Sequence, residues 1–321
     1  MNVLITPGLT LPTPSADDIE RIRRAAGPGS NVTVCEASVA HEHAANVEAI
    51  LGFISPRLLA AAPKLRWVHA IASGVDTFLF PAFRQSPVVL TSEKGLVGEH
   101  LADHAFGLLL MLTRQLATAF KFGPDAWNHR PEMRAKEIEL TGLTMGCVGF
   151  GGTGRAIVKR AAAFGMVCQA IDPEPVPGTA EVPTPLGVDA FGDLLATSDV
   201  VAVCCPLTPR TRNLFDGDAF ARMKRSAFLV NVTRGEVMDE EALVRALETG
   251  QIRGAALDVA PREPLPSDSR LWAQQNVVMT PHTAGASQFR AARNIDRFIT
   301  NLERLRAGEP LEGLIDKDKG Y

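Results

Sequence analysis

Short apolar runs alternate with amphipathic stretches of helical period along the first 96 residues. The apolar runs predict five strands, at residues 2–6, 31–37, 47–54, 65–73 and 88–92. The stretch SADDIERIRRAAG predicts a helix, with Ser15 as its N-cap and Gly27 as its stop. Strands that alternate with helices in this way form a parallel sheet covered by helices on both faces.

A second alternation of the same kind begins near residue 144. It predicts six strands, at residues 145–150, 167–172, 199–207, 227–233, 254–260 and 276–282. Six strands with crossovers are the strand count of a doubly wound dinucleotide-binding fold. The chain is therefore predicted to be α/β, with two doubly wound parallel-sheet domains. A long helix is expected from Gly98 to Phe120, and a final helix at residues 288–307 is expected to pack back on the first domain.

Composition and charge exclude several classes of protein. The 321-residue chain has a formal net charge of −3 and no long block of like charge, so we expect neither nucleic acid nor a membrane as a partner. The longest apolar run, residues 105–112, is too short to cross a bilayer, and the N-terminus lacks the pattern of a signal peptide. The five cysteines form no CxxC pair, which indicates reduced thiols and a cytoplasmic protein.

His100 and His104 have the spacing of two zinc ligands on one helix face. No third ligand accompanies them, and the residues between them lack a general-base glutamate. We therefore expect no metal site, and we place both histidines at the surface or in an interface.

The stretch CVGFGGTGRAIVKRAAAFGMVCQAID joins a strand, a glycine-rich turn, a helix and a second strand. Gly149, Gly151 and Gly154 form the pattern G-x-G-x-x-G at the strand-to-helix turn. The first glycine permits the sharp bend, the second permits a pyrophosphate to approach, and the third permits close packing of helix and strand. Gly152 and Thr153 would present backbone N–H groups of the helix N-terminus to the phosphates.

Asp172 ends the strand that follows this helix, where dinucleotide-binding proteins carry an acid ~20 residues beyond the glycines. An acid here accepts hydrogen bonds from the adenosine ribose and repels a 2′-phosphate. We therefore expect NAD(H) as the favoured cofactor. NADP(H) stays open as the alternative, because a neighbouring cation could compensate for the acid.

Four ionisable residues lie at or just beyond the ends of predicted strands in the second half of the chain: Arg234, Asp258, Glu263 and His282. Ligands of doubly wound folds bind outside the carboxyl ends of the strands, so these residues are expected to converge. Taken singly, each has an ordinary structural explanation, such as a surface ion pair for the arginine. In this order, behind a dinucleotide fingerprint, they indicate a catalytic site.

The ordered motifs resemble those of the D-isomer-specific 2-hydroxyacid dehydrogenases. They are Leu140–Asp172, CCPLTPRTRNLF, MKRSAFLVNVTRGEVMDEEALVRAL, GAALDVAPREPLP and NVVMTPHTAG. The resemblance implies a flavodoxin-like substrate domain over residues 1–96 and 287–321, and a Rossmann NAD domain over residues 97–286. It also implies an oxidoreductase that transfers hydride between a nicotinamide cofactor and C2 of a small 2-oxo acid or D-2-hydroxy acid.

Residue by residue, the resemblance implies that Arg234 binds the substrate and that His282 is a catalytic histidine paired with Glu263. The chemistry suits these residues, since reduction of a 2-oxo acid needs a proton donor that titrates near neutrality and a cation that grips a carboxylate. In the first domain, AIASGVDTF resembles the family's substrate loop, in which Ser73 and Gly74 offer N–H groups to the substrate carboxylate. An ordinary strand-to-loop turn explains that stretch equally well.

Several further residues fall at the family's cofactor positions. They are Cys205, Pro206, Val232, Thr233, Asp258, His282 and Ala284. The chain departs from the family at Val232 and Thr233, where smaller residues are usual, and at Gly152, where a larger one is common. Family members usually dimerise through helices that flank the nucleotide domain, so we expect a homodimer. Residues 98–116 are apolar enough for that interface, and a core helix explains them equally well.

Two alternative functions fit the same residues. A 2-imino acid is isoelectronic with a 2-oxo acid at C2, so the same scaffold could produce D-amino acids. The family also includes corepressors that sense the dinucleotide and bind partner peptides with little turnover. No residue in the chain separates these alternatives from a dehydrogenase.

Overall fold

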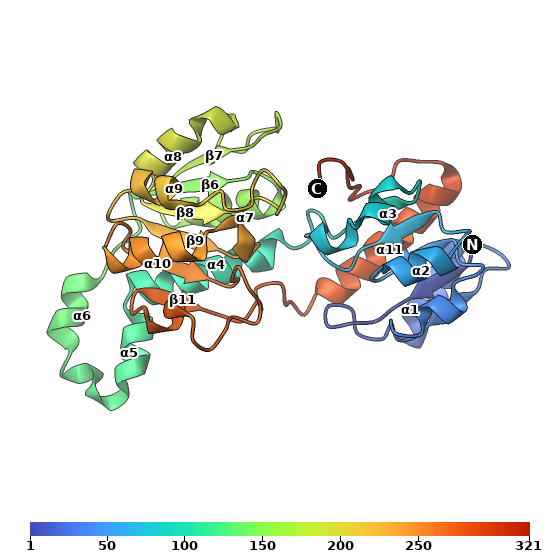
Figure 1. Cartoon of the computed structure of the whole chain (residues 1–321), viewed down its shortest axis with the longest axis horizontal. Helices are drawn as coiled ribbons and strands as arrows, with labels where there is room; N and C mark the ends of the chain where they lie inside the picture. Colours follow the sequence, from blue (N-terminus) through green and yellow to red (C-terminus); the bar gives the residue numbers. More distant parts are fainter. The chain divides into compact units, whose positions relative to one another are not determined.

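The computed structural model describes every residue from Met1 to Tyr321, and the chain divides into two compact units. Unit 1 comprises Met1–Val97 and Ala286–Tyr321, and unit 2 comprises Gly98–Gly285. Each unit contains one parallel sheet with helices on both faces (Figure 1). The predicted α/β class with two doubly wound parallel sheets is confirmed.

Unit 1 has a five-stranded sheet in the order β2-β1-β3-β4-β5, which is the order of flavodoxin-like folds. The strands are β1 (Val3–Ile5), β2 (Val32–Val34), β3 (Ala49–Leu51), β4 (Trp67–His69) and β5 (Val89–Thr91). All five lie inside the apolar runs that predict them. The central strands β1, β3 and β4 are buried along their whole length, because helices cover both of their faces.

Four helices cover this sheet. They are α1 (Ala16–Ala26), α2 (Pro56–Ala61), α3 (Pro81–Gln85) and α11 (Arg290–Ala307). Ser15 caps α1 by accepting a hydrogen bond from Asp18 N, and Gly27 ends the helix with φ 98°. α1 and α11 pack on one face of the sheet, so the last helix returns to the first sheet as the sequence predicts.

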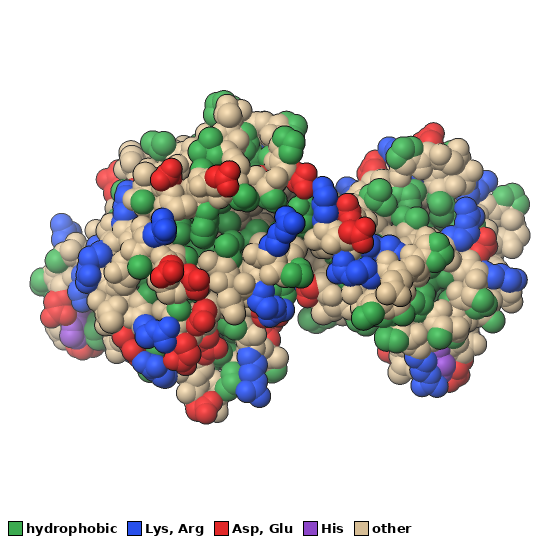
Figure 2. All heavy atoms as spheres, turned by 45° about the horizontal axis from the view of Figure 1, so that its top comes forward, with side chains coloured by type: hydrophobic (Ala, Val, Ile, Leu, Met, Phe, Trp, Pro, Cys, Tyr) green, Lys and Arg blue, Asp and Glu red, His purple; other side chains and the backbone are tan.

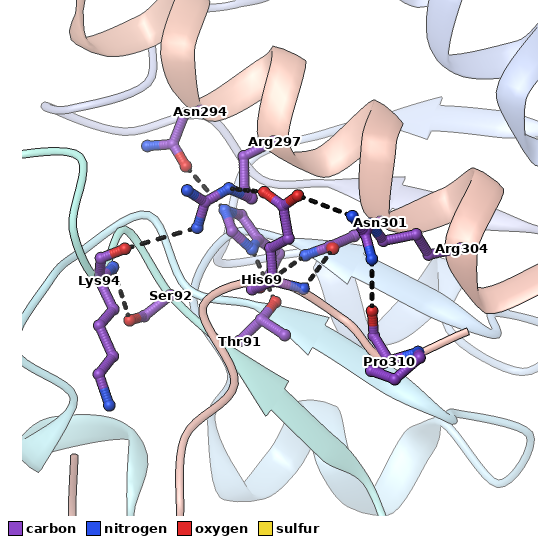
Figure 3. A network of polar contacts seen from close by, with 10 residues as sticks. His69, Thr91, Ser92, Lys94, Asn294, Arg297, Asn301, Arg304 and Pro310 are labelled. Carbon is purple, nitrogen blue, oxygen red and sulfur yellow. Dashed lines mark hydrogen bonds and ion pairs between the residues drawn. The ribbon is translucent and has the colours of Figure 1, made fainter. Parts of the chain in front are cut away.

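Buried polar contacts fix α11 to the sheet of unit 1 (Figure 3). His69, which ends β4, contacts Thr91 Oγ1 through Nδ1 at 2.7 Å and Asn294 Oδ1 through Nε2 at 2.9 Å. All three residues are fully buried. Further along α11, Asn301 exchanges two hydrogen bonds with the backbone of Glu312 and so holds the final segment of the chain.

Unit 2 has a six-stranded sheet in the order β7-β6-β8-β9-β10-β11. The strands are β6 (Thr144–Val148), β7 (Val167–Ile171), β8 (Val200–Val203), β9 (Phe228–Asn231), β10 (Gly254–Leu257) and β11 (Val277–Met279). All six predicted strands form. Beyond β6 lies β7, and Leu186 adds a single parallel bridge to Ile171 on its outer side, where the familiar dinucleotide-binding order 3-2-1-4-5-6 places a full strand. The direction of winding reverses between β6 and β8.

Helices cover both faces of this sheet as well. α4 (Gly98–Thr113) and α7 (Gly152–Ala163) pack on one face, and the other face carries α8 (Phe191–Thr197), α9 (Gly217–Arg222) and α10 (Glu240–Glu248). Side chains alternate along the strands accordingly, because successive residues point to opposite faces. Cys147 and Val230 face the first set of helices, while Val148 and Leu229 face the second.

The single helix predicted from Gly98 to Phe120 is wrong at its end. Gln115 adopts a left-handed conformation with φ 52°, and its side-chain amide donates to Leu112 O, which ends α4. Three further helical segments follow: α5 (Leu116–Phe122), a short 3₁₀ helix (Gly123–Trp127) and α6 (Arg130–Lys136). The sequence has no glycine or proline at this break. The turn is supported by the side-chain hydrogen bond of Gln115 instead.

On the face drawn in Figure 2, basic and acidic side chains are interspersed over each unit. This distribution agrees with the small formal net charge of −3. None of the helices is both long and apolar enough to span a bilayer.

Candidate active site

The six strands of unit 2 end at one common register. Their last residues pair in succession across the sheet: Ile171, Val148, Val203, Asn231, Leu257 and Met279. The segments that follow the strands therefore leave from one edge. They carry every residue of this unit that the sequence assigns to a cofactor or to catalysis. This edge, beside the reversal between β6 and β8, is where doubly wound folds bind ligands.

The three glycines of the turn after β6 have distinct surroundings. Gly149 has φ 98°, and a Cβ there would lie 2.7 Å from Cys205 N, so only glycine fits. A Cβ on Gly154 would lie 2.3 Å from Gly149 O, which shows how closely α7 packs on the turn. Gly151 has no atom within 4 Å of its Cβ position. The exposed backbone of Gly151 and Gly152 therefore has room for a pyrophosphate at the N-terminus of α7.

Asp172 lies beside this glycine turn. Its Oδ2 accepts a hydrogen bond from Phe150 N at 2.8 Å, and its Oδ1 accepts one from Glu174 N at 3.0 Å. Each oxygen keeps a lone pair for a ribose hydroxyl. A cation borders the same turn, since Arg155 stacks on the Phe150 ring at 4.7 Å and donates to Pro177 O.

The histidine and the glutamate that the sequence pairs are in contact. His282 Nδ1 lies 2.7 Å from Glu263 Oε2. Because a carboxylate only accepts, Nδ1 carries a proton and Nε2 is left for another partner. Glu263 Oε1 accepts from Ala260 N at 3.0 Å, which fixes the glutamate. The side chains of His282 and Glu263 are 44% and 38% exposed, so solvent and small molecules reach the pair.

The segment of Arg234 lies close to the segment of Glu263, because the glycine after the arginine, Gly235, permits a close backbone contact. A Cβ on Gly235 would lie 1.9 Å from the carbonyl carbon of Ala260, so the two backbones touch. The segment of Arg234 therefore packs directly against the segment that carries Glu263. The arginine side chain is half-buried, and its Nη1 donates to Thr233 O at 3.1 Å.

A buried asparagine, absent from the predicted site residues, orients the arginine segment. Asn231 is fully buried at the end of β9 and donates from Nδ2 to Arg234 O at 2.9 Å. Its Oδ1 accepts from Thr233 N at 3.0 Å. The only feature of the sequence that could have indicated a role for Asn231 is its position, as a polar residue directly after the apolar run AFLV. Asn231 therefore fixes the turn from which Arg234 leaves the sheet.

Asp258 is buried beneath the histidine segment, with 1% of its surface exposed. Three consecutive backbone N–H groups donate to it. His282 N reaches its carbonyl oxygen at 2.7 Å, Thr283 N reaches Oδ1 at 2.9 Å, and Ala284 N reaches Oδ2 at 2.8 Å. The cofactor role of Asp258 stays a prediction. In the structure, Asp258 holds the backbone of the His282 segment through these three hydrogen bonds.

His104, which we expect at the surface or in an interface, is partly exposed and also makes a contact within unit 2. Its side chain is 25% exposed, and Nε2 lies 2.7 Å from Thr280 Oγ1. The contact joins α4 to the segment after β11, across 176 positions of sequence. No local pattern reveals a contact between elements so distant in the chain.

In unit 1, Ser73 and Gly74 lie in the segment after β4. No hydrogen bond within the chain occupies the backbone N–H of either residue. The segment is braced next to them, because Glu93 N donates to Ala72 O at 3.3 Å. The Glu93 carboxylate is buried in turn against Arg290 of α11, with Nε 3.0 Å from Oε1. The two amides are therefore available to an anion on a fixed segment.

The cysteines and possible metal ligands add no second kind of chemistry. Cys205 lies at the same edge of the sheet, and burial raises the pKa of its thiol to about 12, so it is a neutral thiol near pH 7. Its neighbour in the predicted cofactor set, Pro206, accepts a hydrogen bond from Thr211 at 2.7 Å. All five cysteines are free. No three His, Cys, Asp or Glu side chains are grouped so that they could hold a metal ion.

A glycine turn with room for a pyrophosphate and a solvent-exposed histidine–carboxylate pair lie at the same sheet edge, an arrangement that suits a dinucleotide-dependent oxidoreductase. Residues 106–284 match the family model "D-isomer specific 2-hydroxyacid dehydrogenase, NAD binding domain". The chain is 34% identical over 272 residues to a glyoxylate reductase of Korarchaeum cryptofilum, covering 83% of this chain and 80% of that protein. It is 32% identical over 257 residues to a glycerate dehydrogenase of Methylorubrum extorquens, covering 77% and 78%.

A solved structure shows the same similarity over nearly the whole chain. It is a D-isomer specific 2-hydroxyacid dehydrogenase from Xanthobacter autotrophicus in complex with NADPH and MES, with a TM-score of 0.81, 28% identity and 99% of each chain covered. The chain belongs to the D-isomer-specific 2-hydroxyacid dehydrogenase family. It is a nicotinamide-dependent oxidoreductase of the kind that interconverts small 2-oxo and 2-hydroxy acids.

Proposed function

We propose that this protein is an NAD(H)-dependent reductase of small 2-oxo acids that forms D-2-hydroxy acids, with Arg234, Glu263 and His282 as its catalytic residues. The observation that carries the proposal is the 2.7 Å contact between His282 Nδ1 and Glu263 Oε2 in an exposed pair. The segments of Arg234 and of the glycine turn leave from the same sheet edge. Reduction of a carbonyl group requires a proton donor, a carboxylate-binding cation and a dinucleotide site in one place.

The proposed chemistry adds a hydride to C2 and a proton to the carbonyl oxygen. The nicotinamide supplies the hydride when the cofactor is bound. His282 donates the proton from Nε2, because Nδ1 is held by Glu263. The carboxylate of Glu263 stabilises the imidazolium and sets the ring orientation. After the transfer, the exposed ring regains a proton from solvent.

For the substrate carboxylate we propose two partners. The guanidinium of Arg234 offers a planar pair of donors and also polarises the C=O bond. The backbone N–H groups of Ser73 and Gly74 offer two further donors from unit 1. These donors recognise only the carboxylate and the oxygen on C2. Both groups occur in the substrates that the relatives' names imply, glyoxylate as a 2-oxo acid and glycerate as a 2-hydroxy acid.

For the cofactor we propose the glycine turn and Asp172. The backbone of Gly149, Gly151, Gly152, Thr153 and Gly154 would hold the pyrophosphate. The carboxylate of Asp172 would bind the ribose, which favours NAD(H) over NADP(H). NADPH is the second candidate, because the Xanthobacter relative binds it and because Arg155 beside the turn offers a cation for a 2′-phosphate. Cys205, Pro206, Val232, Thr233, Asp258 and Ala284 complete the proposed cofactor set.

We also propose that the protein is a homodimer of the cytoplasm. α4 packs largely within the core of unit 2. We therefore propose the helical arm, Leu116–Lys136, as the dimer interface in place of residues 98–116. None of the three helical segments of the arm has a buried residue, and Phe120 and Trp127 are 80% and 78% exposed. A second copy of the arm would cover these side chains. The five free thiols support a reducing compartment.

The proposed activity is tested by following NADH and NADPH oxidation with 2-oxo acids of increasing size, with and without ammonia. We expect turnover without ammonia and a preference for NADH. His282→Ala should lower kcat by about 10²- to 10⁴-fold while the Kd for NADH stays within a few-fold, because only proton transfer is lost. His43→Ala, which changes an exposed histidine of unit 1, is the matched control.

Three results would count against the proposal. Turnover that requires ammonia would point to 2-imino acids as the substrates. Cofactor binding without turnover would point to a sensing protein. An unimpaired His282→Ala variant would remove the histidine from the mechanism.

A further inference from the structure

The backbone of His282 is held in an uncommon conformation. Its φ is 53°, in the left-handed region that residues other than glycine seldom adopt. Such a conformation persists when the surroundings determine it. Here the N–H groups of His282, Thr283 and Ala284 all donate to the buried Asp258. The N–H of His282 donates to the main-chain oxygen of Asp258, and the next two N–H groups donate to its carboxylate, so the backbone that follows the proposed proton donor depends on where this carboxylate is held.

A chain of hydrogen bonds leads from Asp258 to α4. Thr280 Oγ1 lies 2.6 Å from Asp258 Oδ1, and His104 Nε2 lies 2.7 Å from Thr280 Oγ1. The carboxylate can only accept, so the single hydroxyl proton of Thr280 points to Asp258. The hydroxyl oxygen must then accept from His104, which places a proton on Nε2. Nε2 is also only 3.4 Å from Asp258 Oδ1.

This chain has a fixed direction and ends at the proposed active site. His104 donates to Thr280, Thr280 donates to Asp258, and Asp258 accepts the backbone N–H groups of the His282 segment. His104 is a ring on a long helix of the core, so its position is set by the packing of α4. Neither His104 nor Thr280 is part of the glycine turn or of the proposed catalytic set.

We infer that His104 is a positioning residue for His282, acting through Thr280 and Asp258. The inference rests on the proposed function of His282 as proton donor. Without His104, the Thr280 hydroxyl loses the donor that orients it, and the Asp258 carboxylate loses the imidazole that lies 3.4 Å away. The His282 backbone then gains alternative conformations, and its ring meets the substrate less often in the reactive position.

The test compares His104→Ala with His104→Gln, whose side-chain amide can donate from the position of Nε2. We expect His104→Ala to lower kcat about tenfold, less than the hundredfold that a 1 Å misplacement can cost. KM for the 2-oxo acid and Kd for NADH should stay within about twofold. His104→Gln should restore kcat to within about threefold of wild type, whereas a general loss of stability would not be rescued in this way. His43→Ala is the control.

A second readout does not depend on turnover. The Nδ1 proton of His282, which is hydrogen-bonded to Glu263, gives an imidazole NMR signal that His282→Ala assigns by its loss. His104→Ala should shift or broaden this signal, and His104→Gln should not. Thr280→Val removes the middle of the chain at nearly constant volume and should act like His104→Ala, so it serves if His104→Ala fails to fold.

The outcomes separate the two proposals. Normal kcat and an unchanged His282 signal in both His104→Ala and Thr280→Val would overturn the positioning role and leave the proposed function intact. If wild type reduces no 2-oxo acid, the proposed function fails. The NMR signal then decides alone whether His104 positions His282.

Discussion

At the scale of single residues, the proposed preference for NAD(H) rests on the carboxylate of Asp172. Its charge would repel a 2′-phosphate. We therefore expect Asp172→Ser to raise the ratio of kcat/KM for NADPH to that for NADH about tenfold or more, which corresponds to about 1.4 kcal/mol. Steady-state kinetics with both cofactors measure the ratio.

Asp172→Asn is the matched variant, because the amide oxygen still accepts the hydrogen bond from Phe150 N. It separates the charge of the carboxylate from its support of the glycine turn. A similar rise in both variants assigns the effect to charge. An unchanged ratio in both would contradict the role proposed for Asp172.

The role of a residue can be predicted from the sequence when it depends on local structure, and cannot when it depends on contacts between distant segments. Gly149 and Gly154 are predictable because their requirement is local: one must turn sharply and the other must pack against the turn. His282 and Glu263 were placed by resemblance, and the structure shows their contact. His104 and Asn231 could not be placed, because their roles arise only when the sheet and α4 are assembled.

At the scale of elements, the docking of α11 on the unit 1 sheet makes stability depend on pH. Burial lowers the pKa of His69 to about 4 from 6.5; the hydrogen bond with Asn294 opposes this shift, and nearby Arg297 adds to it. Between these values the unfolded chain binds more protons than the folded unit. The free energy of unfolding therefore falls as pH falls from about 6.5 to about 4, by about 3 kcal/mol in total.

Urea unfolding at pH 7 and pH 4.5 tests this dependence, with His69→Gln as the comparison. Trp67 is the only tryptophan of unit 1, so its fluorescence in a Trp127→Phe, Trp272→Phe background follows that unit. The glutamine does not titrate, so its variant should lose about 2.5 kcal/mol less over this range than the protein with His69. Equal losses in the two proteins would show that His69 is not the titrating group.

Elements also show what pattern alone predicts. The eleven apolar runs gave all eleven strands, because each run is long enough to cross a buried sheet. The strand order of unit 2 could not be predicted from these runs. A buried strand has the same apolar sequence pattern whether β8 lies beside β6 or beyond β7. The break between α4 and α5 was missed, because Gln115 supports it with one side-chain hydrogen bond.

At the scale of the whole molecule, the helical arm needs a covering surface. Its base is closed by the Arg114–Glu137 ion pair at 2.7 Å and by a hydrogen bond from Ile138 N to Thr113 O. Its two α-helices, α5 and α6, have seven residues each and bury none of them, and helices this short are marginal without packing. In the proposed homodimer, a second copy of the arm would supply that packing by the two-fold symmetry usual for homodimers.

The double variant Phe120→Glu, Trp127→Glu should therefore be monomeric at concentrations where wild type is dimeric. Losing an aromatic hot-spot contact at an interface costs about 2 kcal/mol or more, so the dimer Kd should rise at least about 30-fold. Sedimentation equilibrium measures both constants. Trp272→Glu changes another exposed tryptophan, outside the arm, and should leave Kd unchanged. A monomeric wild type, or an arm variant with the wild-type Kd, would show that the arm is covered by something other than a second copy.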